Sequence, residues 1–450
     1  MTLATTPEYD DGQVSGSDNH AIVVGGSMAG LLAARVLVDA FEKVTLIERD
    51  PLPDDTVVRR GIPQARHVHA LHEGGRATLN DLFPGYSEEL TGSGAVKLDM
   101  ASDLNFYDQG DFAADGPNRI PWYCASRPLI ERITRRRVIH LDGVVVRDRC
   151  QFTQFLLDDA GSTVEGVIIR NRNGDQEELA AELVVTATGR TSRIPTWLEE
   201  HGYASPPTDE VSINLAYSSV QLDRSPDQQQ AYIVMQSPPR TRGGALFPIE
   251  DGRWLMTLAG VHGDHPPTDR EGLAEFAGGL PVSVFEQLVD ERELVSGEIA
   301  HYPFPSNRRC RYWDLDRFPE GLVVIGDAIA SYNPIYGQGM SVAALEAVHL
   351  HHALVEDRGD GLALRFFDRI KPVVNDAWKV AVGADFRFPE TTGPKPAGTD
   401  LLNRYLVRYT RKAHTNGSLT DAFIRVMIME RRPTSLLHPR FMWHVLKPTL

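Results

Sequence analysis

The chain has 450 residues, a formal net charge of −15 at pH 7 and a hydrophobic share of 42%. Its length predicts two or three domains, and its acidic charge argues against nucleic acid or an anionic membrane as a partner. The three scattered cysteines form neither a disulfide framework nor a metal-ligand pattern. Because no charged-then-apolar leader and no run of about 18 apolar residues is present, we expect a cytoplasmic protein without a transmembrane segment.

Residues 1–17 are polar and rich in Gly, Asp and Thr, which predicts a disordered tail. The stretch AIVVGGSMAG, residues 21–30, then runs from an apolar strand through a Gly-rich turn into a helix, the context of a dinucleotide-binding fingerprint. We expect Gly25 to form the tight turn and Gly30 to let the helix pack closely on the strand. The residues that would present the helix N-terminus to a pyrophosphate are Gly26, Ser27, Met28 and Ala29.

Ser27 occupies the position of the middle glycine of the fingerprint, where a small side chain can be tolerated. Glu48 closes the second strand, KVTLIE, and is the acidic residue expected about 20 residues further on to hold a ribose hydroxyl, with Arg49 beside it. An ordinary strand–turn–helix without a ligand is the alternative for this unit.

The segment after Arg49 is broken by prolines and rich in Arg and His. The triplet His67, His69 and His72 lacks a fourth ligand, and nearby arginines repel cations, so we expect no metal site. An Arg-rich loop over the dinucleotide, followed by a helix over residues 69–82, is the preferred interpretation.

The apolar runs within residues 84–118 are short and interrupted by Gly and Asp, which predicts brief strands and the start of a second domain. Ser126 then caps a helix that begins at Arg127, from where the arginine side chain can reach back toward the dinucleotide. Residues 144–159 and 163–171 predict a small antiparallel sheet closed by an Asn-Gly turn.

The segments between residues 211 and 260 alternate with a period of two, which predicts a larger antiparallel sheet with one buried face. A helix over residues 270–288 follows. Near the end of the chain, helices are expected from Gly339 onward, at residues 361–383, and once or twice within residues 401–445. His349, His351 and His352 on the first of these are expected to serve packing or the surface.

A second glycine-containing stretch lies about three hundred residues after the fingerprint, at residues 321–340, GLVVIGDAIASYNPIYGQGM. It places Gly326 and Asp327 at the end of an apolar strand and then begins a helix with two glycines. A carboxylate there can bind a ribityl hydroxyl, and the Gly-rich helix start offers N–H groups to a flavin ring and a pyrophosphate.

Together with Gly25–Gly30, Glu48 and Arg127, this stretch resembles the class A flavin monooxygenases, the para-hydroxybenzoate hydroxylase-like family, over about residues 19–354. Within that family, RRGIPQARHVHAL, residues 59–71, resembles the polyether-type flavin epoxidases.

The resemblance implies FAD as the cofactor. It implies that Glu48 binds the adenosine ribose, Arg127 the pyrophosphate region and Asp327 the ribityl chain or the pyrophosphate, with Arg60 as a weaker contact. The residues that would line the isoalloxazine are Pro334, Gly337, Gln338, Gly339 and Met340. No catalytic side chain is assigned, because the flavin carries the difficult chemistry.

The implied fold is α/β, with a Rossmann-like FAD-binding domain, an inserted antiparallel β-sheet substrate domain and a C-terminal helical region. The expected boundaries are residues 18–85, 116–200 and 301–360 for the FAD-binding domain, 86–115 and 201–300 for the substrate domain, and 361–450 for the helical region.

One motif departs from the family. Where an Asp-Gly pair linked to FAD and NAD(P)H is expected, this chain has Thr188 and Gly189, although Ser192 and Arg193 match. NAD(P)H therefore donates electrons either directly, in an altered manner, or through an external flavin reductase.

The implied function is FAD-dependent monooxygenation, which inserts one oxygen atom from O2 into a largely apolar organic substrate by epoxidation or hydroxylation through a C4a-hydroperoxyflavin. One alternative is a flavin-dependent reductase of isoprenoid double bonds, similar to the geranylgeranyl reductases. Another is a non-catalytic FAD-binding protein. A flavin halogenase is disfavoured because no W-x-W-x-I-P segment is present.

Overall fold

The computed structural model describes residues 6–14, 17–295 and 297–447. Residues 1–5 and 15–16 of the predicted tail lie outside this description. The part between them contradicts the expectation of disorder, because Tyr9 is anchored on the folded protein. Its hydroxyl donates a 2.7 Å hydrogen bond to Asp39, and its ring lies 4.7 Å from that of His351.

A parallel sheet forms one end of the molecule, in the strand order β17-β11-β1-β2-β7. The strands are β1 (Ser17–Val24), β2 (Phe41–Ile47), β7 (Val144–Arg147), β11 (Leu183–Thr186) and β17 (Leu322–Val324). Parallel strands are buried on both faces, and the apolar runs in β1 and β11 match that requirement. The predicted strand–turn–helix is confirmed, since α1 (Met28–Leu37) follows β1 directly.

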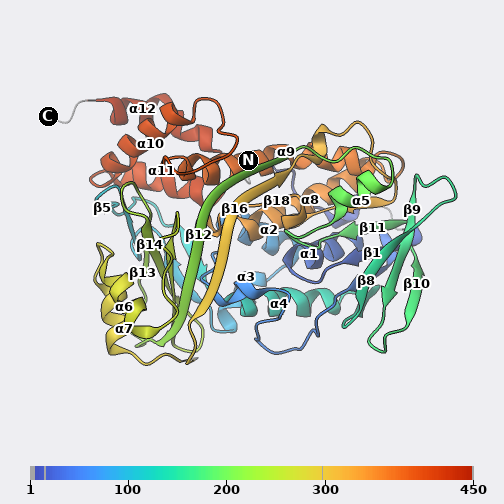
Figure 1. The fold of residues 1–450 in the computed structure, drawn as a ribbon, viewed down its shortest axis with the longest axis horizontal. Helices are drawn as coiled ribbons and strands as arrows, with labels where there is room; N and C mark the ends of the chain where they lie inside the picture. The colour runs from blue at the N-terminus through green and yellow to red at the C-terminus, as the bar shows by residue number, and fades with distance from the viewer. Residues whose placement is uncertain (1–5, 15–16, 296, 448–450) are drawn as a thin grey trace.

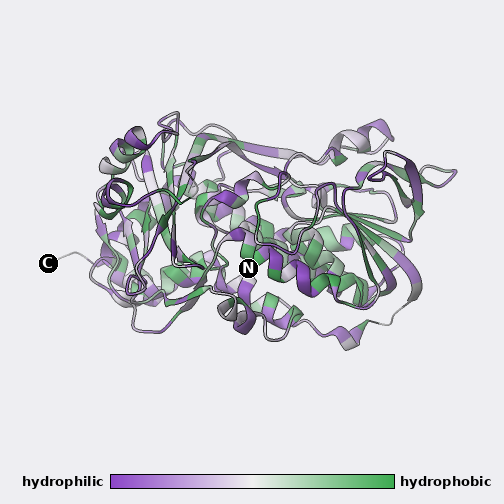
Figure 2. Ribbon diagram, turned by 90° about the horizontal axis from the view of Figure 1, so that it is seen from below, coloured by the Kyte–Doolittle hydropathy of each residue, from purple (hydrophilic) through white to green (hydrophobic). Residues whose placement is uncertain are grey.

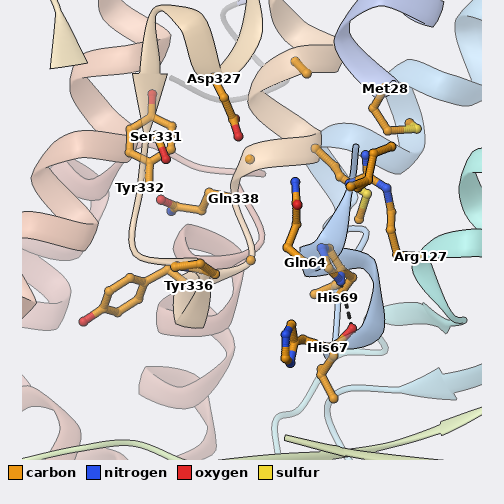
Figure 3. A pocket seen from close by; sticks show the side chains of 18 of the residues that line it. Met28, Gln64, His67, His69, Arg127, Asp327, Ser331, Tyr332, Tyr336 and Gln338 are labelled. Atoms are coloured by element: carbon orange, nitrogen blue, oxygen red, sulfur yellow. Dashed lines mark hydrogen bonds between the residues drawn. The ribbon is translucent and has the colours of Figure 1, made fainter. Parts of the chain in front are cut away.

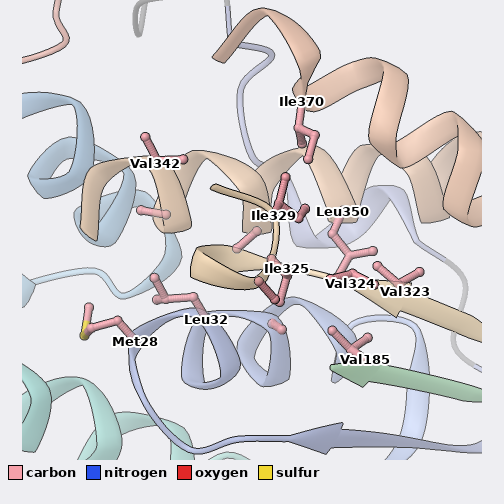
Figure 4. Close-up of a cluster of buried hydrophobic side chains, with 14 of the residues drawn as sticks. Met28, Leu32, Val185, Val323, Val324, Ile325, Ile329, Val342, Leu350 and Ile370 are labelled. Atoms are coloured by element: carbon pink, nitrogen blue, oxygen red, sulfur yellow. The ribbon is translucent and has the colours of Figure 1, made fainter. Parts of the chain in front are cut away.

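The core of this end is built where helices meet the parallel strands. Leu32 of α1, Val185 of β11, Val324 of β17 and Leu350 of α8 (Gly339–Glu356) belong to one buried cluster (Figure 4). The hydropathy colouring agrees, since the strands of this sheet are mainly hydrophobic (Figure 2). The helix α4 (Arg127–Ile139) also packs against α1.

A second, three-stranded antiparallel sheet lies at the outer edge of this end. It contains β8 (Gln151–Leu157), β9 (Val164–Arg170) and β10 (Gln176–Ala180). The predicted Asn-Gly turn joins β9 to β10. Residues 144–147 do not belong to this sheet as expected, because Val144 pairs in parallel register with Val44 and makes β7 an edge strand of the parallel sheet.

The large sheet has the order β18-β16-β12-β15-β14-β13-β4-β5 and crosses the middle of the molecule (Figure 1). It contains β4 (Leu104–Asp108), β5 (Asp111–Phe112), β12 (Thr208–Asp223), β13 (Ala231–Val234), β14 (Arg242–Ile249), β15 (Arg253–Gly260), β16 (Ala300–Cys310) and β18 (Ala330–Ser331). All neighbours pair antiparallel except β4 and β13, which are parallel. The antiparallel sheet predicted over residues 211–260 is thus confirmed, but the expectation of one buried face is wrong for β14 and β15, where residues on both faces are buried.

β16 spans the expected boundary at residue 301 and pairs with β12 from Ala300 to Cys310. The chain therefore returns to the parallel sheet only at β17. The brief strands predicted between residues 84 and 118 are confirmed by β3 (Val96–Asp99) and β4. β3 pairs with β6 (Pro121–Cys124), which lies beyond that range, in a short two-stranded sheet.

The helices differ from prediction mainly at their ends. The helix expected over residues 69–82 is α2 (Glu73–Leu82), because residues 67–72 run in extended conformation. The helix expected over residues 270–288 is two helices, α6 (Arg270–Gly278) and α7 (Val284–Glu291), separated at Gly279 and Pro281. The short helices α3 (Tyr86–Gly92) and α5 (Ile194–Glu200) complete this part.

The C-terminal region is helical, as expected. α9 (Leu362–Asp385) packs beside α8, and three further helices follow rather than one or two: α10 (Thr399–Ala413), α11 (Gly417–Met427) and α12 (Pro439–Leu446). These three share a small apolar core around Tyr409, Leu419 and Phe441. Within the described ranges, no helix is long and apolar enough to cross a membrane.

Candidate active site

A cavity of about 470 Å³ opens at the carboxyl ends of β1, β2, β11 and β17 and continues beneath the large sheet (Figure 3). In open α/β sheets, ligands bind outside the carboxyl ends of the parallel strands. The cavity lining includes most of the residues expected at the dinucleotide site: Gly25, Gly26, Ser27, Met28, Ala29, Glu48, Arg49, Arg127, Gly326, Asp327, Pro334, Gly337, Gln338, Gly339 and Met340.

The glycines of the fingerprint act as the sequence predicts. Gly25 has a φ of +110°, and a Cβ there would lie 2.5 Å from the carbonyl oxygen of Ala187. A Cβ on Gly30 would lie 1.7 Å from the carbonyl oxygen of Gly25. Gly30 therefore lets α1 approach the turn closely, and it does so from behind the cavity rather than in its lining.

Glu48 is buried at the end of β2 and holds the glycine turn. Its carboxylate accepts a 2.8 Å hydrogen bond from the Gly26 backbone N–H and a 2.9 Å hydrogen bond from that of Asp50. The cavity passes beside it, so binding of a ribose by Glu48 stays a prediction.

Arg60 does not line the cavity at which it was expected. Its side chain is exposed and is not among the cavity-lining residues, whereas its neighbour Arg59 is buried and lines the cavity. The expectation for Arg60 is thus replaced by Arg59.

Arg59 and Glu131 of α4 form an ion pair that sequence reasoning missed. The Arg59 guanidinium donates to Glu131 at 2.8 and 2.5 Å and lies 3.2 Å from Glu48. Arg127 and Arg135 lie 3.5 and 3.6 Å from the same Glu131 carboxylate. A Glu four residues after Arg127 on a helix is the one sequence signal that pointed to this cluster.

Arg127 lies at the first position of α4, where Ser126 caps the helix by accepting a hydrogen bond from the Leu129 backbone N–H. The Arg127 guanidinium donates a 3.0 Å hydrogen bond to the Ser27 hydroxyl at the start of α1. Its Nε is buried and has no protein partner among the described residues. Arg127 therefore presents a donor to the cavity beside the glycine turn.

Asp327 projects into the cavity from the turn after β17 (Figure 3). Its side chain is exposed to the cavity, where partial removal from bulk water raises the pKa of the carboxyl and the charges of Arg127 and Arg190 lower it. A carboxylate that faces the cavity in the field of two arginines suits hydroxyl groups of a ligand, the role expected from the sequence.

The loop from Pro334 to Gly339 forms the next part of the wall, before α8 begins. Gly337 has a φ of +64°, and the Gln338 Oε1 is buried without a partner in the described part of the chain. A Cβ on Gly339 would meet nothing within 4 Å. His72 binds the Tyr336 carbonyl oxygen at 2.8 Å and so holds this loop from the opposite side.

His67, His69 and His72 each form a hydrogen bond within the protein. His67 contacts the Ser219 hydroxyl at 2.7 Å, and His69 contacts the His67 carbonyl oxygen at 2.9 Å. Burial lowers the pKa of His67 to about 4 and that of His69 to about 3. Over the described ranges, no group of His, Cys, Asp and Glu is arranged to hold a metal ion.

The far end of the cavity is apolar and lies under the large sheet. It is lined by Met100, Leu104, Phe106, Trp122, Ile233, Met235, Phe247, Phe423, Ile424, Met427 and Ile428. The last four come from α11 and the residue after it, so the C-terminal helical region closes this end. The sequence carried no local signal for that contribution.

These features fit a dinucleotide cofactor. Ser27 forms no side-chain cap, so the first N–H groups of α1 remain available where Met28 and Ala29 line the cavity. The unpartnered Arg127 Nε and Gln338 Oε1 supply a donor and an acceptor further along.

Comparison with known proteins agrees. A family model described as an FAD binding domain matches residues 18–361. Protein Rv3254 of Mycobacterium tuberculosis is 33% identical over 437 residues, which is 92% of this chain and 90% of that protein. Kynurenine 3-monooxygenase of Salinispora tropica is 26% identical over 451 residues, 92% of each protein.

Among solved structures, the flavin-dependent brominase Bmp2 superposes with a TM-score of 0.66 at 16% identity, covering 92% of this chain and 94% of that one. This likeness concerns the fold, and it confirms the expected α/β architecture. Because the family model covers more than half of the sequence, the chain belongs to the FAD binding domain family, as its resemblance to the class A flavin monooxygenases implied.

Proposed function

We propose that this protein is an FAD-dependent monooxygenase that inserts one oxygen atom of O2 into a largely apolar organic substrate, by epoxidation or hydroxylation. One observation carries the proposal: a single cavity joins the glycine turn at Gly25 to the apolar walls around Trp122 and Phe247. A protein that only stored FAD would not need an apolar chamber next to the flavin end of the site.

In this proposal, FAD lies along the cavity with its adenosine end near Glu48 and its ring end near residues 334–340. When bound, FAD supplies the redox chemistry and the activation of O2. The start of α1 and Arg127 bind the pyrophosphate, since helix N-termini and guanidinium groups both favour phosphate oxygens. Asp327 accepts hydrogen bonds from hydroxyl groups of the cofactor.

The apolar end of the cavity binds the substrate and excludes water. Its walls offer aromatic rings and methionines, and the T-shaped pair of Trp122 and Phe247, with ring centroids 4.6 Å apart, gives it a rigid side. His67 lies between the two ends and is uncharged at neutral pH, because its pKa is lowered to about 4. It therefore supplies a neutral hydrogen-bonding group without introducing a charge into the chamber.

NAD(P)H is the proposed electron donor, either directly or through a separate flavin reductase. Thr188 and Gly189 line the cavity where the family has an Asp-Gly pair, so the site lacks the usual carboxylate. A cytoplasmic location is part of the proposal, since Cys124, Cys150 and Cys310 are all unpaired, as is usual in a reducing compartment.

The test starts from the purified yellow holoprotein, reduced under nitrogen and then mixed with ¹⁸O2 in the presence of a panel of alkenes and phenols. A monooxygenase transfers one ¹⁸O atom into a product. Saturation of an alkene under nitrogen, with no oxygen incorporated, would instead identify a flavin-dependent reductase of isoprenoid double bonds. Absence of any turnover with every donor would leave a non-catalytic FAD-binding protein.

A substitution in the apolar end of the cavity tests whether the substrate binds there. Ala245 lines the apolar end, so Ala245→Phe is expected to lower turnover while leaving the flavin absorbance spectrum unchanged. Ile139→Phe, an exposed position at the end of α4, is the matched control and is expected to keep full turnover.

A further inference from the structure

The charge of this protein is divided unevenly along the chain. Residues 395–450 contain 10 of the 46 Lys and Arg but only 3 of the 61 Asp and Glu, which leaves 36 basic and 58 acidic residues in the rest. A net positive helical region thus sits at one end of an acidic protein, opposite β9 and β10 (Figure 1).

The few acidic side chains of this region are already neutralised. Asp421 and Glu430 both pair with Arg425, and Asp400 pairs with Lys395. For Arg404, Arg411 and Lys447, no ion-pair partner is found among the described residues, and all three are exposed.

The same helices carry the most exposed large hydrophobic side chains of the described part of the chain. Trp443 is 70% exposed, Leu401 68% and Leu446 55%. Leu402 and Leu437 add to this surface at 38% and 41%. Large apolar side chains left in water usually mark an interaction site when they cluster.

Contacts between α10 and α12 bring part of these charged and apolar side chains close together. Leu401, Arg404, Arg408 and Arg411 follow the three- and four-residue spacing that places them along one stripe of α10. The Arg408 guanidinium donates to the backbone carbonyl oxygens of Val445, Leu446 and Lys447 at 2.6, 3.1 and 3.3 Å. The end of α12, with Trp443 one turn earlier, is thereby held beside the α10 stripe.

We propose that this face, defined by Leu401, Arg404, Arg411, Trp443, Leu446 and Lys447, binds the surface of an anionic lipid bilayer. Exposed tryptophan and leucine surrounded by arginine and lysine is the combination that lies in the boundary between headgroups and acyl chains. Each basic residue near an anionic membrane adds attraction, and this local positive region overrides the argument from the overall charge of −15.

The face lies close to the apolar end of the cavity, so membrane binding could serve uptake of an apolar substrate; this step rests on the proposed function. One helix, α11, separates the two: Phe423, Ile424 and Met427 line the apolar end of the cavity, while Leu419, Ala422 and Val426 pack toward α10 and α12. Binding of this face to a bilayer would therefore place the wall of the apolar chamber formed by α11 next to the lipid.

The test measures binding alone, so its outcome is independent of whether turnover is ever found. The holoprotein is mixed with vesicles of phosphatidylcholine containing about 30% phosphatidylglycerol, or of phosphatidylcholine only, and bound protein is separated by flotation at low and at high salt. We expect binding to the anionic vesicles at low salt, with at least about tenfold less at high salt or on neutral vesicles.

Two variants with equal charge change locate the surface. Arg404→Glu combined with Arg411→Glu and Lys447→Glu is expected to abolish vesicle binding. The control combines Lys43→Glu, Arg170→Glu and Arg172→Glu, which are exposed at the opposite end, and is expected to bind like the natural protein. Equal losses in both variants would reduce the effect to overall charge and overturn the proposal.

A spectroscopic measurement tests insertion of the aromatic side chain. A blue shift of tryptophan emission on anionic vesicles is expected for the natural protein and not for Trp443→Phe. Failure of the natural protein to float with anionic vesicles overturns the proposal. If a concentration-dependent dimer that Trp443→Ser dissociates is then found, the face belongs to a second copy of this chain; if no dimer is found, an acidic protein partner becomes the preferred occupant.

Discussion

The side-chain amide of Asn333 donates a 2.9 Å hydrogen bond to Asp385, which ties the loop before α8 to the last residue of α9. The Asn307 side-chain amide donates to the other oxygen of the same carboxylate at 2.7 Å, and its Oδ1 accepts from the Asn333 backbone N–H at 2.6 Å. The cavity-lining loop before α8 is thus fixed by a buried carboxylate.

Removal of that carboxylate is expected to loosen the loop. In Asp385→Ala, two buried amide groups lose their acceptor, which costs roughly 1–3 kcal/mol for each unsatisfied group. We expect a lower midpoint of urea unfolding and weaker FAD binding, measured by quenching of flavin fluorescence. Asp368→Ala, on the exposed side of the same helix, is the control. Unchanged FAD affinity in Asp385→Ala would show that the loop holds its shape without this contact.

Substitution of Arg127 and of Arg60 compares an arginine that lines the cavity with one that does not. Arg127→Ala is expected to weaken FAD binding by about tenfold or more, about 1.4 kcal/mol, because the donor beside the glycine turn is lost. Arg60→Ala is expected to bind FAD normally, since its side chain lies outside the cavity lining. Titration of the apoprotein with FAD measures both. A larger loss in Arg60→Ala than in Arg127→Ala would contradict the assignment.

Glu346 predicts a pH dependence of stability. It is fully buried in α8, where burial raises the pKa of its carboxyl to about 8, although one oxygen accepts a 2.7 Å hydrogen bond from the Gly326 backbone N–H. The folded-state pKa thus exceeds the ordinary value of 4.5. Folding therefore favours the protonated carboxyl. Its contribution to the free energy of unfolding is fully present below pH 4.5 and is lost as the pH rises toward and through about 8.

Glu346→Gln tests this sign directly. The neutral amide still accepts from Gly326 and does not ionise, so the variant is expected to gain stability relative to the natural protein as the pH rises from 5 to 8, by roughly 3–5 kcal/mol at most. Chemical unfolding at several pH values measures the difference. Glu356→Gln, exposed on the same helix, should show no such gain. A constant difference at all pH values would mean that Glu346 is ionised throughout.

Three glycine substitutions distinguish a packing requirement from an open site. Gly30→Ala places a Cβ 1.7 Å from the Gly25 carbonyl oxygen and is expected to prevent soluble folding. Gly339→Ala meets no protein atom within 4 Å and is expected to fold with normal stability but to bind FAD less tightly, because the new methyl group occupies the cavity. Gly92→Ala, also unobstructed and distant from the cavity, is the control for both. Normal folding of Gly30→Ala would disprove the close approach of α1.

Local features of the site were predictable because they depend on neighbouring residues. The positive φ of Gly25 and the strand–turn–helix around it follow from a sequence of about ten residues, and so does the helix cap at Ser126. The antiparallel strands within residues 211–260 were likewise predictable from local alternation. The burial of both faces of β14 and β15 was not, because it depends on the elements that pack against the sheet.

What the sequence by itself determined about this protein is therefore its cofactor class and the order of its elements. Only the tertiary structure decided which of two adjacent arginines enters the cavity, because the choice of Arg59 over Arg60 depends on Glu131, 72 residues away. It also decided that α11 closes the apolar chamber and that Arg408 of α10 holds the end of α12. Such contacts are set by how helices pack, and packing joins residues whose distance along the chain carries no pattern.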